Sequence, residues 1–394
     1  MKHYSTIALS CLIGFSTLYA SEKDQEILSQ TKKEILNYSY EKSIEDSDKL
    51  KKDWINPFNY KYIYNNGETY TTKRSTVSIT QPIFKSGGIY YAIKYANSIG
   101  EYSTTSVDVQ RKELIKQTIN LLFQIKKIDI TIKKQKLLVA NAKLDITRKK
   151  EQVLNGILDT SFLDNAILDA NTKQNNLIDL EYERETLINN LSKLSDKQYN
   201  EVELPKLALI EENNFLDNNI YIKKAKEDIN SAYWLKNMTI SSYLPTVNLT
   251  ADYTKYHDID NNPALSEDGN THVGFNITIP IDIRFNNTIA STKLDYLQKK
   301  ATLEDQKKEE QAIFKSSLAK LKSLDKKMEI AKSDVQLYDS LLMQLQEQLS
   351  VGMSTLSDVE TMKNSKAIKK LELLSLDIDK QIELLEIYSR TEHE

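Results

Sequence analysis

Four segments alternate apolar and polar residues in the way expected of β-strands with one apolar face. The alternation is cleanest in residues 271–284, and it recurs in residues 54–64, 74–84 and 244–256. The connections, residues 65–73 and 257–270, are polar and rich in Asn, Asp, Gly and Thr. The pattern therefore predicts two strand pairs with exposed loops. The apolar face would be formed by Phe58, Tyr60, Tyr62, Tyr64, Val77, Ile79, Ile83, Val247, Leu249, Ala251, Tyr253, Val273, Phe275, Ile277, Ile279 and Ile281.

Each strand pair precedes a segment with the periodicity of a very long helix. After Gly88 the chain continues to about Val153 without a proline, and a helix of this length would extend roughly 100 Å. Its apolar residues recur at spacings of three and four, and residues 328–349 have the same rhythm. Such a stripe is typical of a packing seam, here interrupted at Thr118, Gln135 and Lys149. Residues 163–194 and 356–388 are predicted to run back as helices.

The strand–helix boundary and a glycine turn each occur twice at nearly the same separation. Gln81-Pro82-Ile83-Phe84 resembles Ile279-Pro280-Ile281-Asp282, 198 positions later. The turn around Asn155-Gly156-Ile157 recurs around Val351-Gly352-Met353, with 196 positions between the glycines. These offsets predict a duplicated unit of short helix, two strands, long helix, glycine turn and returning helix. We assign residues 21–195 to the first repeat, 196–212 to a non-helical linker and 213–394 to the second repeat.

Residues 1–20 have the composition of an export signal. Lys2 and His3 provide the positive start, and the apolar run that follows is too short to span a bilayer. We predict cleavage after Ala20, which leaves Ser21 as an unlipidated N-terminus. The only cysteine, Cys11, lies inside this segment, so the mature protein is predicted to have no disulfide and no thiol chemistry.

Composition excludes several classes of function. The 53 Lys and Arg residues nearly balance the 56 Asp and Glu residues, so no basic excess indicates a nucleic-acid partner. No motif predicts a catalytic site or a cofactor, and we expect a protein that is not an enzyme. The four histidines are dispersed and predict no metal site: His3, His257, His272 and His393.

Two arrangements satisfy the strand pattern. Each pair is either a soluble hairpin whose apolar face packs on a helix, or part of a membrane barrel with an apolar exterior in lipid and a polar interior in water. The export signal, and the lack of a later apolar stretch long enough for a membrane helix, favour the barrel.

Four strands cannot close a barrel, because the smallest outer-membrane barrels have about eight. The wall must then be shared between chains. Two copies would give eight strands around a filled interior, and three would give twelve around a lumen. The long duplicated helices with polar inward faces favour three.

The approaches to the strand pairs, Trp54-Ile55-Asn56-Pro57 and Ser242-Tyr243-Leu244-Pro245, complete a series of motifs. Together with the proline exits and the glycine turns, this series resembles that of the TolC-type outer membrane efflux proteins over essentially the whole mature length. The resemblance implies a homotrimer in outer-membrane lipid, with a twelve-stranded membrane β-barrel above a long periplasmic α-helical barrel. It also implies a passive export duct whose tips dock a periplasmic adaptor fed by an inner-membrane pump or exporter.

The resemblance also places the functional residues. Asp358, six positions after Gly352, would line the narrowest part of the pore, although a solvated Asp at a helix start is an alternative. The family's second aspartate is replaced here by Thr361, its tip arginine is replaced by Ser354, and Asp164 falls two positions late. The tips that meet the adaptor, with exposed apolar groups, would be Asn155, Gly156, Ile157, Leu158, Val351, Gly352, Met353 and Ser354.

Two other classes of protein fit part of the pattern. One is an exported coiled-coil structural or adhesion protein whose strands pair in water. The other is a periplasmic adaptor, which also carries helical hairpins. Adaptors usually have one such hairpin set within compact β domains, whereas this chain is predicted to have two of equal length.

Overall fold

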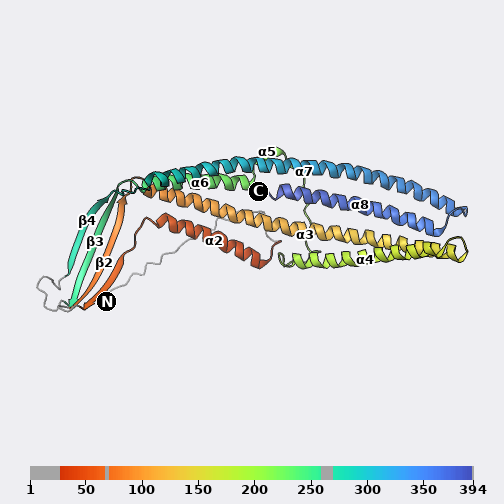
Figure 1. Ribbon diagram of the computed structural model, residues 1–394, viewed down its shortest axis with the longest axis horizontal. Helices are drawn as coiled ribbons and strands as arrows, with labels where there is room; N and C mark the ends of the chain where they lie inside the picture. The colour runs from red at the N-terminus through yellow and green to blue at the C-terminus, as the bar shows by residue number, and fades with distance from the viewer. Residues whose placement is uncertain (1–26, 67–70, 259–268, 393–394) are drawn as a thin grey trace, which may run out of the picture.

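The computed structural model describes residues 27–66, 71–258 and 269–392. The predicted export signal, with its cleavage site and Cys11, lies outside these residues. The described chain is a long layer of helices with a four-stranded antiparallel sheet at one end (Figure 1). None of its helices combines the length and the hydropathy that crossing a bilayer requires.

The predicted order of elements occurs twice. The first series is α2 (Gln30–Lys52), β1 (Asn59–Asn66), β2 (Thr71–Phe84), α3 (Gly88–Leu154) and α4 (Thr160–Leu191). The second is α6 (Ile220–Ser241), β3 (Thr246–Asp258), β4 (Asn270–Thr278), α7 (Phe285–Ser350) and α8 (Leu356–Tyr388). Residues 192–211, between the two series, contain no helix or strand. They lead into a short helix that was not predicted, α5 (Glu212–Asp217).

The predicted strand boundaries shift by up to three residues at most ends, and two of them are wrong by more, for which proline accounts. The last strand ends at Thr278 and does not reach Arg284, and the first begins at Asn59 and not at Trp54. Pro280 and Pro57 have no N–H to donate to a sheet ladder. Pro82 is tolerated inside β2 because the register shifts between Pro82 and Phe84.

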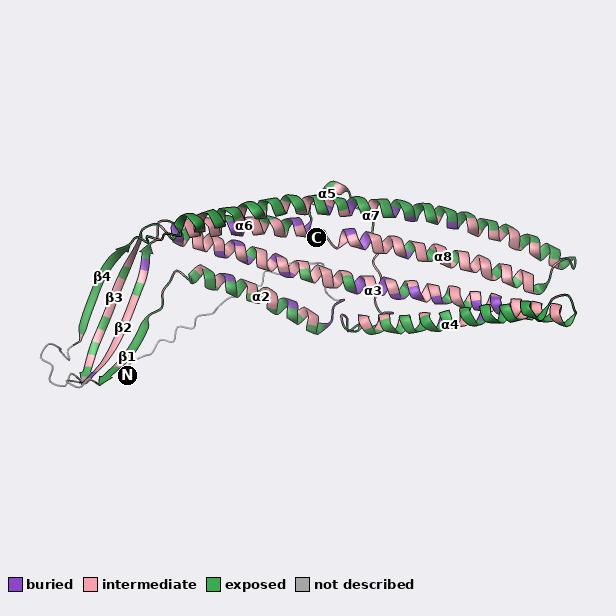
Figure 2. Cartoon of the chain, viewed as in Figure 1, coloured by how far each residue is buried: buried purple, intermediate pink, exposed green. Residues whose placement is uncertain are grey.

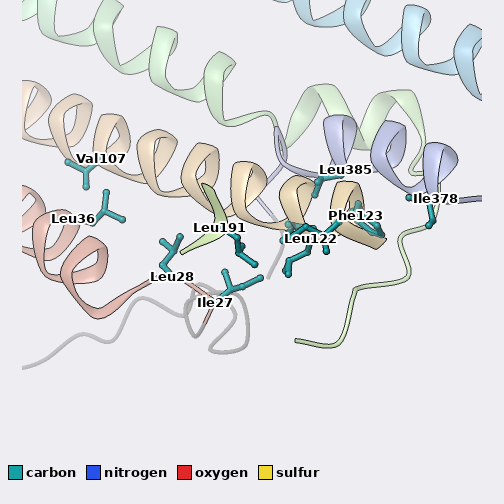
Figure 3. Packing of buried hydrophobic residues seen from close by; sticks show 11 residues of the cluster. Ile27, Leu28, Leu36, Val107, Leu122, Phe123, Leu191, Ile378 and Leu385 are labelled. Carbon is teal, nitrogen blue, oxygen red and sulfur yellow. The ribbon is translucent and has the colours of Figure 1, made fainter. Parts of the chain in front are cut away.

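The core of the helical layer lies around the middle of α3. Figure 3 shows Leu122 and Phe123 of α3 packed together with Leu191 of α4 and Leu385 of α8. The predicted seam is confirmed at Ile125, Ile128, Ile132, Val139 and Ala142, which are all buried. Thr118, which interrupts the apolar stripe, is fully buried, and its hydroxyl donates to the Leu114 carbonyl at 2.8 Å. A threonine can therefore lie in the seam without an unpaired polar group.

The short and the returning helices meet end to end in both repeats. The Ser29 N–H donates to the Leu194 carbonyl at 2.8 Å, which joins the start of α2 to the end of α4. The Ile220 N–H donates to the Arg390 carbonyl at 3.0 Å, which joins α6 to α8 in the same way. These bonds satisfy an N–H group at the start of α2 and another at the start of α6, which have no partner within their own helices.

A buried carboxylate holds the second of these junctions. Glu310 of α7 has no exposed surface. It accepts from Arg390 Nη1 at 2.9 Å, Asn219 Nδ2 at 2.9 Å and Gln306 Nε2 at 2.8 Å. Arg390 also donates to Glu386, whose second oxygen lies 2.7 Å from Lys116 of α3. The network connects α3, α6, α7 and α8, and sequence patterns did not predict it.

Replacing Arg390 by Met should lower the free energy of unfolding by about 3–5 kcal/mol, because it leaves the Glu310 charge buried without its cation. Lys223→Met is the matched control, since the Lys223–Glu392 pair is largely exposed and should contribute less than about 1 kcal/mol. Urea titration in detergent, followed by circular dichroism, measures both. Equal stability of the two variants would contradict a structural role for the buried pair.

Candidate functional site: a two-faced sheet and a paired helical tip

The four strands form one sheet with a continuous apolar face. The order is β1-β2-β3-β4, and the register aligns Tyr60 with Val77, Val77 with Tyr253, and Val247 with Ile277. Side chains of the same face meet across every strand pair, as the alternation requires. The predicted apolar residues that lie within the regular strands therefore share one side of the sheet. Phe58, Ile279 and Ile281 were predicted to belong to this face but lie outside the strands, and Ile83 lies at the register shift of β2, where Phe84 pairs with Val247.

This apolar face is exposed to a degree that is unusual for a protein in water. Tyr60, Val273, Phe275 and Ile277 are between 63% and 74% exposed. The sheet projects beyond the helices, so none of the described helices covers the apolar face (Figure 1). The hypothesis of soluble hairpins packed on a helix is therefore wrong. A continuous patch of this kind marks an interaction with a membrane or another protein.

The opposite face of the sheet is polar and hydrogen-bonded across the strands. Asn248 donates to Asn276 at 2.9 Å, and the hydroxyls of Thr76 and Thr254 are 3.1 Å apart. His272 Nδ1 lies 3.6 Å from an Asp252 carboxylate oxygen. The sheet is thus able to face water on one side and an apolar medium on the other.

Both edges of the sheet are open. The outer strands β1 and β4 have 8 and 9 residues, whereas the central strands β2 and β3 have 14 and 13. Each outer strand pairs on one side only within the described chain. The unpaired N–H and C=O groups of such edges are templates for another strand.

The two predicted tips have the same local geometry. Gly156 and Gly352 have φ of +70° and +76°. The residue after each glycine donates its N–H to a carbonyl five residues earlier: Ile157 to Gln152 and Met353 to Gln348, both at 2.8 Å. This is the glycine-ended helix cap with a positive φ. A Cβ at either glycine would meet nothing within 4 Å, so the backbone conformation, and not space, explains the glycines.

The tips carry an exposed apolar surface, although one residue that was predicted to be exposed there is half-buried. Ile157, Val351 and Met353 are 69%, 66% and 81% exposed, as expected. Leu158 is half-buried, and Leu154 and Leu356 are exposed in its place. Of the other tip residues, Ser354 is half-buried and donates its hydroxyl to the Leu345 carbonyl at 3.0 Å, while Asn155 and Gly156 are exposed. The apolar surface is therefore at the extreme end of the long helices, where it cannot contribute to the core.

Asp358 lies in the first turn of α8 and closes a capping box. It accepts from the Thr355 N–H at 3.1 Å, and the Asp358 N–H donates to Thr355 Oγ1. The Thr355 hydroxyl, which donates to Asp358 Oδ2 at 2.7 Å, and the Thr355 N–H lower the pKa of Asp358 below its ordinary value, with a smaller contribution from Arg148. The carboxylate is therefore ionised at neutral pH. Within one chain, the capping of α8 is enough to explain why an aspartate occupies this position.

The partner of Asp358 could not be predicted from the sequence. Arg148 of α3 lies 3.3 Å from Asp358 Oδ1 and also pairs with Asp145. Arg148 and Asp358 are 210 positions apart, so no local pattern connects them. The only signal was the Asp145–Arg148 spacing of three on a predicted helix near the tip. In the structure this ion pair joins the first helical hairpin to the second.

Within the described ranges, no cluster of three or more His, Cys, Asp or Glu side chains is placed to hold a metal ion. Of the four histidines, His3 and His393 lie outside these ranges. His257 is exposed, and its Nε2 lies 2.8 Å from the Ser75 hydroxyl. His272 is the strand residue beside Asp252 described above. The candidate site thus has two parts: a sheet with one apolar and one polar face, and an apolar surface at the tips of the helical hairpins.

The overall structure is similar to those of outer membrane channels. The CmeC outer membrane channel of Campylobacter jejuni matches with a TM-score of 0.74 over 93% of this chain and 84% of that one, at 13% identity. VceC of Vibrio cholerae gives 0.68 over 90% and 91% at 14% identity, and the open-state MtrE channel of Neisseria gonorrhoeae gives 0.63 over 93% and 86% at 15% identity. The sequence matches no protein-family model, and a search of curated proteins finds no match. The chain therefore has the fold of the TolC-type outer membrane channels.

Proposed function

We propose that this chain is one subunit of a passive outer-membrane export duct. Three copies would complete a twelve-stranded barrel in the outer membrane and a helical tube in the periplasm. The duct would work with a periplasmic adaptor and an inner-membrane pump or exporter, which supplies the energy. The similarity to outer membrane channels supports this proposal.

The observation that carries the proposal is the two-faced sheet with two open edges. An apolar face that no helix covers suits contact with lipid, and a polar face suits a water-filled lumen. In lipid, an unpaired backbone group costs several kcal/mol, so open edges cannot remain there. Strands of 8 to 14 residues also fit the roughly 9–11 residues that a tilted strand needs to cross a bilayer.

The two alternative classes explain less of the structure. A coiled-coil adhesion protein needs no sheet with one apolar face outside the helical layer. A periplasmic adaptor has a single hairpin within compact β domains, whereas α3–α4 and α7–α8 form two hairpins of nearly equal length. Neither class accounts for the edges of the sheet.

The tips are the proposed contact with the adaptor. Water selects polar side chains at the exposed end of a helical hairpin, but here Leu154, Ile157, Val351, Met353 and Leu356 are exposed. Exposed apolar groups at this position suit the core of a protein–protein interface. We therefore expect the adaptor to bind the tips and not the barrel.

Asp358 is the proposed acidic residue of the periplasmic pore entrance. Rotation about a three-fold axis would bring three copies close together, and a ring of carboxylates attracts cations. Arg148 lies beside each carboxylate and would offset part of its charge. The balance of these two residues would then set the selectivity of the closed pore.

The first test concerns the apolar face. Ile277→Arg should reduce membrane trimers, because a charge near the middle of the bilayer costs about 2–4 kcal/mol in each chain. Asn276→Arg places the same charge on the polar face and should be tolerated. Heat-modifiable trimers in outer-membrane fractions measure both. Equal loss in the two variants would contradict the barrel assignment and with it the proposed function.

The second test concerns the tips. In the double variant Ile157→Glu/Met353→Glu, export should be lost while the yield of trimers is unchanged, since both side chains lie outside the core. Ile157→Leu/Met353→Leu retains the apolar surface and should retain export. Growth of producing cells in dilution series of dyes, detergents and metal ions measures export. Normal growth with the charged variant would remove the docking proposal.

The third test concerns the pore. Asp358→Asn should lower the cation preference in planar-bilayer recordings, and Arg148→Gln should raise it, because the two charges have opposite signs. Glu360→Gln removes a neighbouring exposed carboxylate and should change the preference less. Identical selectivity in the parent, Asp358→Asn and Arg148→Gln channels would show that Asp358 caps α8 and does not contribute to the pore.

A further inference from the structure

The apolar face of the sheet changes in composition along the strands. At the end next to the helices, its exposed side chains are aliphatic or phenylalanine: Leu249, Val273, Phe275 and Ile277. The opposite end, where β1 leads to β2, points away from the helices (Figure 1). There the same face carries aromatic and basic residues: Tyr62, Tyr64, Lys73, Lys255 and His257.

The strand register places these residues in successive rows. From the middle of the sheet towards the far end, the rows are Tyr60–Val77–Tyr253, then Tyr62–Ser75–Lys255, then Tyr64–Lys73. Residues two positions apart on a strand point to the same face. Lys73 and Lys255 therefore lie on the face of Val77 and not on the polar face of the sheet.

His257 joins the same group of side chains. The register of β2 and β3 shifts beside Lys73, just before β3 ends. The His257 Nε2 atom lies 2.8 Å from the Ser75 hydroxyl, and its ring centroid lies 6.1 Å from that of Tyr62. The Tyr60 hydroxyl is 3.0 Å from the same Ser75 oxygen. Two lysines and an imidazole thus share one end of the apolar face.

These side chains lie at the surface. Tyr62 and Tyr64 are 55% and 56% exposed, and Figure 2 shows β1 exposed along almost its whole length. Lys255 is exposed as well. The Lys73 Nζ atom lies 5.8 Å from the centroid of the Tyr64 ring, within the range of a cation–π contact. The charged groups are therefore directly beside aromatic surface.

The distance along the strands places the lysines at the border of an apolar band. Ser75, in the row of Lys255, and Phe84, at the helical end of β2, are nine positions apart. Nine residues of a strand span about 30 Å. With the strand tilt of membrane barrels this corresponds to about 23 Å perpendicular to the membrane, close to the roughly 25 Å height of their apolar band.

We infer that Lys73, Lys255 and His257 form a binding site for the phosphate of a lipid headgroup at the outer surface of the membrane. Lysine is a common ligand of phosphate, and the hydrocarbon chains of the same lipid lie along Val77 and Tyr253. A free phosphate ion uses the cations but not the apolar surface beside them. The inference rests on the proposed insertion of the sheet in the outer membrane, and it adds a lipid that each subunit binds.

Lipid binding by the detergent-extracted protein tests the site. Native mass spectrometry with increasing lipid A, a glycolipid that carries phosphate groups, measures the lipid retained by each assembly. Lys73→Gln/Lys255→Gln should weaken binding roughly 30-fold, because each lysine near an anionic lipid surface contributes about fivefold. Lys61→Gln is the matched control, since Lys61 pairs with Thr76 on the polar face, and it should bind as the parent does.

Two further variants keep the test independent of assembly. Lys73→Arg/Lys255→Arg retains both charges and should retain lipid A. Lys255→Gln alone should weaken binding about fivefold, and it replaces the double variant if that variant yields no trimers.

The outcomes separate this inference from the proposed function. Trimers that bind lipid A no better than the same glycolipid without its phosphates would overturn the site and leave the duct intact. Equal weakening by Lys61→Gln would do the same. Displacement of lipid A by an equal concentration of inorganic phosphate would show that the lipid is not the ligand. Absence of parent trimers from outer-membrane fractions would contradict the proposed function itself.

Discussion

The strongest physical constraint on this chain comes from the open edges of a four-stranded sheet that has one exposed apolar face. Backbone groups at an edge need hydrogen-bond partners, and they need them most where no water is present. This sheet cannot satisfy them alone, and no helix in the described part of the chain covers its apolar face (Figure 1). In the helical layer, exposed residues are likewise concentrated on the outermost helices (Figure 2). Both properties support the proposal that the chain forms one section of a wall that further copies complete.

Much of this architecture could be predicted from sequence, because it depends on periodic patterns. Alternation identified all four strands, a proline-free run identified α3, and the apolar rhythm of residues 328–349 identified the second half of α7. The repeated glycine turns gave the positions of both reversals, and positive φ at Gly156 and Gly352 confirms them. These features are local in the chain, so no tertiary contact was needed to find them.

The remaining features depend on contacts between distant residues. In the sequence, Glu310 is one more acidic residue on a lysine-rich helix, yet it is fully buried and accepts hydrogen bonds from Asn219 and Arg390, which lie in two other segments. Arg148 and Asp358 meet only because the two hairpins pack side by side. Leu158 was expected at the tip surface, but the turn directs it partly inward and leaves Leu154 exposed. The sequence pattern of one helix or strand does not indicate which other element packs against it.

On the proposed assembly, this chain completes a hollow wall only with further copies of itself. Electron microscopy of the detergent-extracted protein, combined with its mass by light scattering, measures that assembly. We expect a particle of three chains with a three-fold axis, a central lumen through the barrel and a helical tube about 100 Å long. A monomeric particle with its strands folded against the helices would contradict it, as would a pair of chains around a filled eight-stranded barrel.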